Sequence, residues 1–166
     1  MKKIVPLIFH KIITGEVLNF EDVSIGNFLS IFCIKGINFK TIDSAFSYSE
    51  ITEDIVCLTF DDGFSSDWDI VFPILLKNNA TATFFVVTDW IGKEGYLTKS
   101  QIKKMSAAGM QIGSHSHTHP NFYDLDSYEV VREIRISQQC LKNIVGKDIT
   151  AFSFPFGYEN SNLIKL

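Results

Sequence analysis

Short apolar runs constrain the fold of this chain more than any other feature. They occupy residues 3–9, 55–60, 81–87 and 150–154, are apolar at odd and even positions alike, and are rich in β-branched and aromatic residues. This pattern is typical of strands that are covered on both faces, as in parallel sheets. We therefore expect these four segments to be strands of one parallel sheet.

Segments with helical spacing lie between these runs. We expect helices over residues 24–36, 66–79, 98–109 and 127–145. The last of them begins with a capping box from Asp126 to Glu129 and ends at Gly146, which are typical helix boundaries. Pro73 lacks a backbone N–H, so it must kink the second helix or mark an early turn. Strands that alternate with helices predict a parallel β/α domain, either a barrel or an open sheet.

The length and charge of the chain narrow the range of functions. A chain of 166 residues suits a single domain, residues 1–166, with one hydrophobic core. The net charge of −4 and the pI near 5.5 leave no basic surface for a phosphate backbone, so we expect no nucleic-acid partner. No apolar run approaches the roughly 18 residues that a membrane span needs.

The N-terminus and the cysteines indicate in which cellular compartment the protein is expected. The apolar run at residues 4–9 contains Pro6 and leads to no small-residue cleavage site, so we expect a strand rather than a signal peptide, and a cytoplasmic protein. Cys33, Cys57 and Cys140 are far apart and lie among apolar residues. We expect them to be reduced core side chains rather than a disulfide framework or a zinc site.

Three loops that follow predicted strands carry residues suited to chemistry. They are residues 61–67, which begin Asp-Asp-Gly, residues 114–122, which contain three histidines, and residues 155–160. Parallel strands deliver such loops to one end of the sheet, where β/α proteins place their functional residues. We therefore expect the three loops to lie together.

The aspartate pair has two interpretations. Asp61 and Asp62 could begin a strand-to-helix turn, where a carboxylate near a helix N-terminus is favourable. Alternatively, a turn at Gly63 lets both carboxylates reach one cavity from different directions. The pair alone does not decide between them.

The histidine cluster is more informative, because imidazoles are the commonest ligands of transition metals. If residues 115–119 are extended, His115, His117 and His119 all face one side. If they form a helical turn, only His115 and His119 share a face; Pro120 disfavours a regular helix but leaves a single turn open. A histidine-rich surface loop that binds nothing is the remaining possibility.

The acidic loop and a histidine pair together supply one oxygen and two nitrogen ligands. Three protein ligands with one position left open are the pattern of a catalytic zinc-type site. Two aspartates allow one to bind the metal while the other accepts a proton from the attacking water. The combination predicts metal-assisted hydrolysis.

Three motifs resemble those of the polysaccharide deacetylases, also called the NodB-homology domain or carbohydrate esterase family 4. LTFDDG at residues 58–63 resembles the first motif of the family, GSHSHTH at 113–119 the second and FPFG at 154–157 the third. The segments between them and the opening VPLIFHKI are also similar to the family, so the resemblance covers most of the chain. It implies a distorted parallel (β/α) barrel and a metal-dependent N-deacetylase of N-acetylated sugars.

The resemblance also implies roles at the reaction centre. Asp61 would be the general base. Asp62, His115 and His119 would hold a divalent transition metal, with zinc expected and cobalt, nickel or manganese as alternatives.

Further roles concern the surroundings of that centre. The backbone N–H of Phe156 would help to hold the oxyanion, and Pro155 and Gly157 would shape the substrate groove. Ser116 would orient the ligand loop from outside the ligand set. His117 falls on a variable position, where we expect it to line the rim or bind solvent and not the metal.

Two departures from the family pattern affect the mechanism. Many members carry an arginine two residues before the proline of the third motif, where it orients the catalytic aspartate, but this chain has Ser153. The sequence stops at Leu166 without a fourth or fifth motif and has no histidine after His119 to act as general acid. We therefore expect a barrel that is incomplete at its C-terminal end, with low activity, and with self-association through that open side or marginal stability.

Three functions are compatible with the sequence. The first is an active N-deacetylase of an N-acetylated glycan or glycolipid, or the catalytic front part of one. The second is a degenerate or truncated member that binds metal or carbohydrate with little or no turnover. The third is a parallel α/β domain with a structural metal or none.

Overall fold

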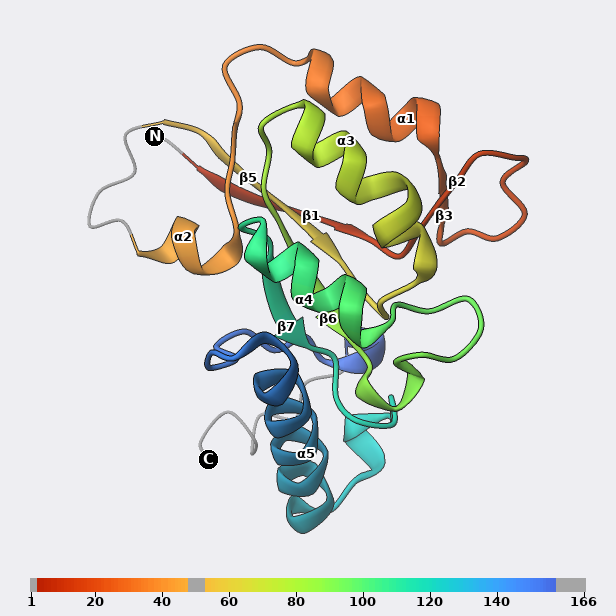
Figure 1. The fold of residues 1–166 in the computed structure, drawn as a ribbon, viewed down its shortest axis with the longest axis vertical. Helices are drawn as coiled ribbons and strands as arrows, with labels where there is room; N and C mark the ends of the chain where they lie inside the picture. The colour runs from red at the N-terminus through yellow and green to blue at the C-terminus, as the bar shows by residue number, and fades with distance from the viewer. Residues whose placement is uncertain (1–2, 48–52, 158–166) are drawn as a thin grey trace.

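A parallel sheet lies at the centre of the computed structural model, which describes residues 3–47 and 53–157 (Figure 1). Its strands are β1 (Ile4–Phe9), β4 (Asn38–Phe39), β5 (Ile55–Phe60), β6 (Ala82–Val86) and β7 (Gln111–Ser114). The order is β1-β5-β6-β7, with β4 paired to the start of β5. A second, two-stranded parallel sheet consists of β2 (Lys11–Ile13) and β3 (Asp22–Ser24). The parallel α/β fold class is therefore confirmed.

Helices connect and flank these strands. They are α1 (Ile25–Ser30), α2 (Ile42–Phe46), α3 (Phe72–Lys77), α4 (Lys99–Ala107) and α5 (Ser127–Val145). Helix α4 packs on β7, and α5 packs on both α4 and β7 (Figure 1). The predicted capping box at the start of α5 is formed, and α4 also begins with one, from Thr98 to Gln101. Over the described ranges, none of these helices combines the length and apolar character needed to cross a bilayer.

Burial differs between the central strands and the end of the sheet. Every residue of β5 and β6 is buried, as the apolar runs predict. By contrast, β1 lies at the end of the sheet, and its side chains Val5 and Ile8 are 41% and 65% exposed. The prediction that residues 3–9 are covered on both faces is therefore wrong. Pro6 is consistent with this position, because a proline that cannot donate to the ladder is tolerated at a sheet edge.

Two predicted helices are shorter than expected. The helix predicted over 24–36 ends at Ser30, and a 3-10 turn at Ile31–Cys33 follows it. The isoleucine and phenylalanine side chains of that turn lose rotamer freedom in a helix, and they pack against the core instead.

The segment predicted as a helix over 66–79 is divided in two. A π-helical turn spans Asp67–Val71, and α3 begins after it with Pro73 in its first turn. Because Pro73 has no N–H to donate, the regular helical hydrogen bond at this point is missing and a wider turn precedes α3. Of the two alternatives expected for Pro73, a kink or an early turn, the structure shows Pro73 in the first turn of α3.

The predicted strand at 150–154 is not formed, and a single bridge between Ser114 and Phe152 replaces it. Two backbone hydrogen bonds flank the bridge, from Ser114 to Ala151 and from Ser153 to Ser114. The ladder ends there because the chain turns at Pro155–Gly157. The expectations of an incomplete barrel and of self-association depend on residues 158–166, which lie outside the described residues, and they stay predictions.

Stacked phenylalanines align the strands that carry the functional loops. Phe9 of β1 pairs with Phe60 of β5, with their ring centroids 5.3 Å apart, and Phe60 in turn stacks on Phe84 of β6 at 5.0 Å. Phe9 and Phe60 are the last residues of their strands. The next residues, His10 and Asp61, therefore leave the sheet at the same edge.

The three cysteines are free, as predicted. Cys57 is buried and Cys140 is half-buried, but Cys33 is exposed, so the prediction that all three are core side chains is wrong for Cys33.

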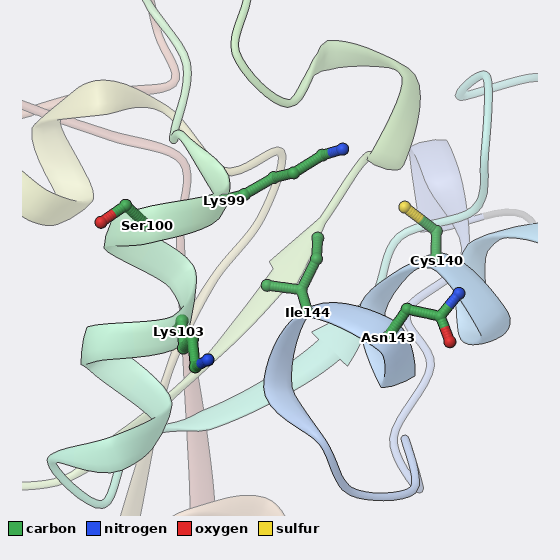
Figure 2. Close-up of a pocket in the computed structure, with 6 residues that line it drawn as sticks. All are labelled: Lys99, Ser100, Lys103, Cys140, Asn143 and Ile144. Carbon is green, nitrogen blue, oxygen red and sulfur yellow. The ribbon is translucent and has the colours of Figure 1, made fainter.

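Cys140 borders a hollow of about 470 Å³ between α4 and α5 (Figure 2). Figure 2 shows Lys99, Ser100 and Lys103 lining it from α4, and Cys140, Asn143 and Ile144 from α5. None of these residues belongs to the three loops that carry the candidate functional side chains.

Candidate active site

The three predicted loops meet in one cavity of about 550 Å³. Its lining includes His10, Asp61, Asp62, His115, His119, Ser153, Phe156 and Gly157. The loops follow β5, β7 and the bridged segment beside β7, so the parallel topology brings them to one end of the sheet.

Asp62, His115 and His119 form a group that could hold a metal ion. One ligand atom from each lies within 4.8 Å of the other two. Oδ1 of Asp62 is 3.4 Å from Nε2 of His119 and 3.6 Å from Nε2 of His115. That oxygen is buried and has no hydrogen-bond partner among the described residues, which is costly unless a cation satisfies it. One carboxylate and two imidazoles therefore fit a zinc-type ion at this position.

His115 is arranged as a neutral ligand. Its Nδ1 lies 2.9 Å from the carbonyl oxygen of Ser153, and a carbonyl can only accept, so Nδ1 carries the proton. The lone pair is then on Nε2, the nitrogen that faces Asp62. Burial, with a contribution from His119, lowers the pKa of His115 to about 3. The imidazole therefore needs no deprotonation before it binds a metal.

Asp61 lies beside this group and is held by a different contact. Its Oδ2 accepts a hydrogen bond from Oγ of Ser153 at 3.2 Å and lies 3.9 Å from Nε2 of His115. Burial raises the pKa of Asp61 to about 6, although His10 and the Ser153 hydrogen bond partly oppose the rise. A carboxylate with a raised pKa is a stronger proton acceptor, which suits a general base.

A left-handed turn explains how adjacent aspartates reach one cavity. Asp62 and Gly63 have φ values of 74° and 80°. A Cβ atom on Gly63 would lie 3.1 Å from Cγ1 of Val86, so the turn packs closely on β6. Of the two interpretations of the aspartate pair, the shared cavity is the one that the structure shows.

The histidine loop is neither extended nor helical. Ser116 and His119 have φ values of 69° and 62°, and such left-handed conformations cost on the order of 1 kcal/mol or more each outside glycine. The backbone N–H of His119 donates to Oγ of Ser116 at 3.0 Å, which stabilises the turn between them. His115 and His119 converge, whereas Nδ1 of His117 lies 2.8 Å from Oγ1 of Thr88, and His117 is not part of the Asp-His-His group.

The third loop closes another side of the cavity. Phe156 has a φ of 61° and is 63% exposed, and its ring lies edge-on to His119 with centroids 4.8 Å apart. Phe156 and Gly157 line the cavity, but Pro155 is buried and is not among the described residues that line it. Pro155 therefore contributes to the turn rather than to the groove surface.

Two residues of the site were missed by the sequence analysis. His10 lines the cavity and lies close enough to lower the pKa values of Asp61 and Asp62. Trp90 packs against the ring of His119, with centroids 5.1 Å apart. The signal for His10 was its position directly after a predicted strand, as for Asp61, whereas no pattern in the sequence pointed to Trp90.

Fold and site together define a parallel α/β protein with a candidate metal centre and a buried carboxylate at the ends of its strands. A family model described as polysaccharide deacetylase matches residues 49–166. The chain belongs to the polysaccharide deacetylase family, as its motifs indicate. The match begins at residue 49, so the assignment of residues 1–166 to one domain stays a prediction.

Individual proteins agree with this assignment. The chain is 31% identical over 114 residues to YxkH of Bacillus subtilis, a match that covers 69% of this chain and 41% of YxkH. It is 30% identical over 132 residues to the peptidoglycan-N-acetylglucosamine deacetylase PgdA of Listeria monocytogenes, covering 76% of this chain and 28% of PgdA. The chain therefore spans less than half the length of these curated relatives.

A solved structure extends the comparison to nearly the whole chain. The deacetylase PplD of Streptococcus pyogenes, solved in complex with acetate, superposes with a TM-score of 0.86 at 26% identity. The superposition covers 98% of this chain and 77% of PplD. IcaB from Ammonifex degensii shares the fold with the same TM-score, at 24% identity.

Proposed function

We propose that this chain is the metal-dependent part of an enzyme that removes N-acetyl groups from an N-acetylated sugar of a polysaccharide or glycolipid. One observation carries the proposal: a buried carboxylate, Asp61, adjoins the group Asp62, His115 and His119 inside one cavity. This combination supplies both a metal site and a separate proton acceptor. Metal-assisted hydrolysis of an amide uses both.

Asp62, His115 and His119 would hold the metal, and zinc fits this donor set best, with cobalt, nickel or manganese as alternatives. A divalent ion there would supply a Lewis acid that polarises the acetamide carbonyl and lowers the pKa of water. Asp61 would accept the proton of the attacking water, in an orientation fixed by Ser153. The backbone N–H of Phe156, at the cavity wall, would bind the carbonyl oxygen as negative charge develops.

His10 would deliver a proton to the leaving amine. An amine leaves poorly as an anion, so a general acid is needed at the nitrogen side of the substrate. His10 lines the cavity from the end of β1, whereas Asp61 enters it from β5. His10 would thus serve as the general acid, for which the sequence offers no histidine after His119.

Two comparisons support the substrate class. PgdA is named for peptidoglycan N-acetylglucosamine, and the PplD structure contains acetate, the acid that N-deacetylation releases. The same cavity in this chain would therefore accept the acetamide group of an N-acetylated glycan. A family member with little turnover is the second candidate, because Ser153 stands where many members carry an arginine.

Acetate release from N-acetylglucosamine oligomers tests the proposal. The protein is stripped with a chelator and then restored with one equivalent of zinc. We expect acetate from the restored protein but not from the stripped one, and release at least about 100-fold slower from the restored Asp61→Asn variant. Stoichiometric zinc binding without acetate release would favour the low-turnover candidate, and absence of zinc binding would contradict both.

A further inference from the structure

The histidine loop has an anchor outside the loop itself. It carries the two left-handed residues Ser116 and His119, and one internal hydrogen bond joins them. Such a backbone persists only where surrounding contacts determine it. On one side the backbone N–H groups of Thr88 and Asp89 donate to the carbonyl oxygens of Ser116 and His117. On the other side the N–H groups of the turn are held by one side chain of α5.

That side chain is Glu133. Its Oε2 accepts hydrogen bonds from the backbone N–H groups of His117 and Thr118, both at 2.8 Å, and its Oε1 accepts one from Oγ1 of Thr118 at 2.9 Å. One carboxylate thus holds three donors on the two residues between Ser116 and His119. Hydrogen bonds to an ionised acceptor are shorter and stronger than neutral ones, so the contact is well suited to fixing a turn.

A second contact of α5 holds the start of the same loop. Ser137 lies one helical turn after Glu133, is buried, and its Oγ is 2.7 Å from Oγ of Ser114. Ser114 Oγ also accepts the backbone N–H of Ser116 at 3.2 Å. Helix α5 therefore contacts the chain on both sides of His115.

We propose that Glu133 is a positioning residue for the metal ligands His115 and His119, acting through the backbone N–H groups of the turn between them. The inference rests on the proposed metal site. Glu133 binds neither metal nor substrate in this arrangement. Its contribution is to make the separation of the two imidazoles independent of metal binding, so that the ion meets a preformed site.

Three substitutions of Glu133 distinguish the effect of its side-chain length from the effect of its negative charge. Glu133→Ala removes the acceptor. Glu133→Gln keeps an oxygen at the same reach without the charge, and Glu133→Asp keeps the charge on a side chain one methylene shorter. Arg135→Ala, at an exposed position of the same helix, is the matched control.

Zinc affinity is measured by competition with a chelator, beside the melting temperature of each metal-free variant. We expect Glu133→Ala and Glu133→Asp to bind zinc about 10- to 100-fold more weakly, a typical effect of losing a partner that orients a metal ligand. Glu133→Gln is expected to stay much closer to the unchanged protein, and Arg135→Ala to match it. Unchanged affinity in Glu133→Ala, or an equal loss in Glu133→Gln and Glu133→Ala, would overturn the proposal.

Amide hydrogen exchange in the metal-free protein tests the contacts of Glu133 independently of the proposed function. In the metal-free protein, the amide protons of His117 and Thr118 should exchange slowly with solvent, and they should become exposed in Glu133→Ala but not in Glu133→Gln. Fast exchange of both amides in the unchanged protein would contradict the anchor even if deacetylation is found. Slow exchange together with absent zinc binding would retain the anchor of the loop but refute its role in metal binding.

Discussion

The hydroxyl of Ser153 donates a hydrogen bond to Oδ2 of Asp61 across 3.2 Å. Through its carbonyl oxygen the same residue accepts a hydrogen bond from Nδ1 of His115. Ser153 thus orients the candidate base by its side chain and a candidate metal ligand by its backbone. A serine can therefore orient this aspartate where many family members carry an arginine.

Ser153→Ala should separate these two contacts, because the backbone carbonyl remains while the hydroxyl is lost. We expect zinc affinity to be unchanged and kcat to fall by about tenfold, the equivalent of ~1.4 kcal/mol in the barrier. Steady-state kinetics and a zinc titration on the same preparation check this. A matching loss of zinc affinity would show that the hydroxyl supports the ligands as well.

Asp61 and Asp62 should respond differently to the same substitution. Asp61→Asn retains zinc and lowers kcat at least about 100-fold, because a general base typically contributes that much. Asp62→Asn loses zinc, since it removes the carboxylate that lies between the two imidazoles. Metal analysis of both variants tests this assignment. Zinc loss in Asp61→Asn but not in Asp62→Asn would make Asp61 the metal ligand and Asp62 the general base.

The three histidines of the second loop should fall into two classes. His115→Ala and His119→Ala abolish stoichiometric zinc binding, whereas His117→Ala leaves it intact because Nδ1 of His117 is directed to Thr88. Isothermal titration with zinc distinguishes the three variants. Equal losses from all three would mean that the loop becomes extended when the metal binds.

His10→Gln should impair only the step in which the amine leaves. We expect kcat on an N-acetylated sugar to fall about 100-fold or more, with zinc affinity unchanged. An activated acetate ester, such as 4-nitrophenyl acetate, has a leaving group that needs no proton and should lose much less activity. An equal loss on both substrates would assign His10 a different role.

Asp67 should lower the stability of the folded protein at neutral pH. Its carboxylate is fully buried, and neither oxygen has a hydrogen-bond partner among the described residues. Burial raises the pKa of Asp67 well above its usual value, with a further contribution from Asp62 and Asp61. An unfolded aspartate loses its proton near pH ~3.9, so stability falls as the pH rises from there through the folded pKa.

Asp67→Asn removes that titration. We expect a gain in the free energy of unfolding at pH 7 on the order of 1 kcal/mol. No gain is expected at pH 3, where Asp67 is largely protonated in both the folded and the unfolded protein. Urea denaturation of the metal-free protein at the two pH values measures it. Asp69→Asn, an exposed aspartate of the same π-helical turn, is the control and should change little. Destabilisation by Asp67→Asn at pH 7 would reveal a partner for the charged carboxylate.

The sequence predicted those parts of the molecule in which local pattern and burial agree. Strands β5 and β6 are apolar at every position and wholly buried, and the cap of α5 is formed by Asp126 and Glu129 as expected. The motif comparison likewise indicated which carboxylate and imidazoles converge. Short elements such as β2, β4 and α2 were missed because two to five residues carry no measurable periodicity.

The conformation of the histidine loop could not be predicted, because tertiary contacts determine it. Ser116 and His119 are left-handed although neither is glycine, and the turn between them is held by contacts to Thr88, Asp89 and Glu133, which are distant in the sequence. His10 had a sequence signal in its position directly after a predicted strand, but its place in the site also depends on the pairing of β1 with β5. Only the register of distant strands brings it beside Asp61.

That pairing has a consequence for how the protein folds. Strand β1 pairs with β5, which lies far along the chain, so the site cannot be complete until a long loop has closed. Closing such a loop is a slow step in folding. A fragment that begins at residue 49, where the family match starts, would keep Asp61, His115 and His119 yet leave one edge of β5 bare. We therefore expect the unit of folding to be larger than the unit of sequence similarity, and the shorter fragment to aggregate.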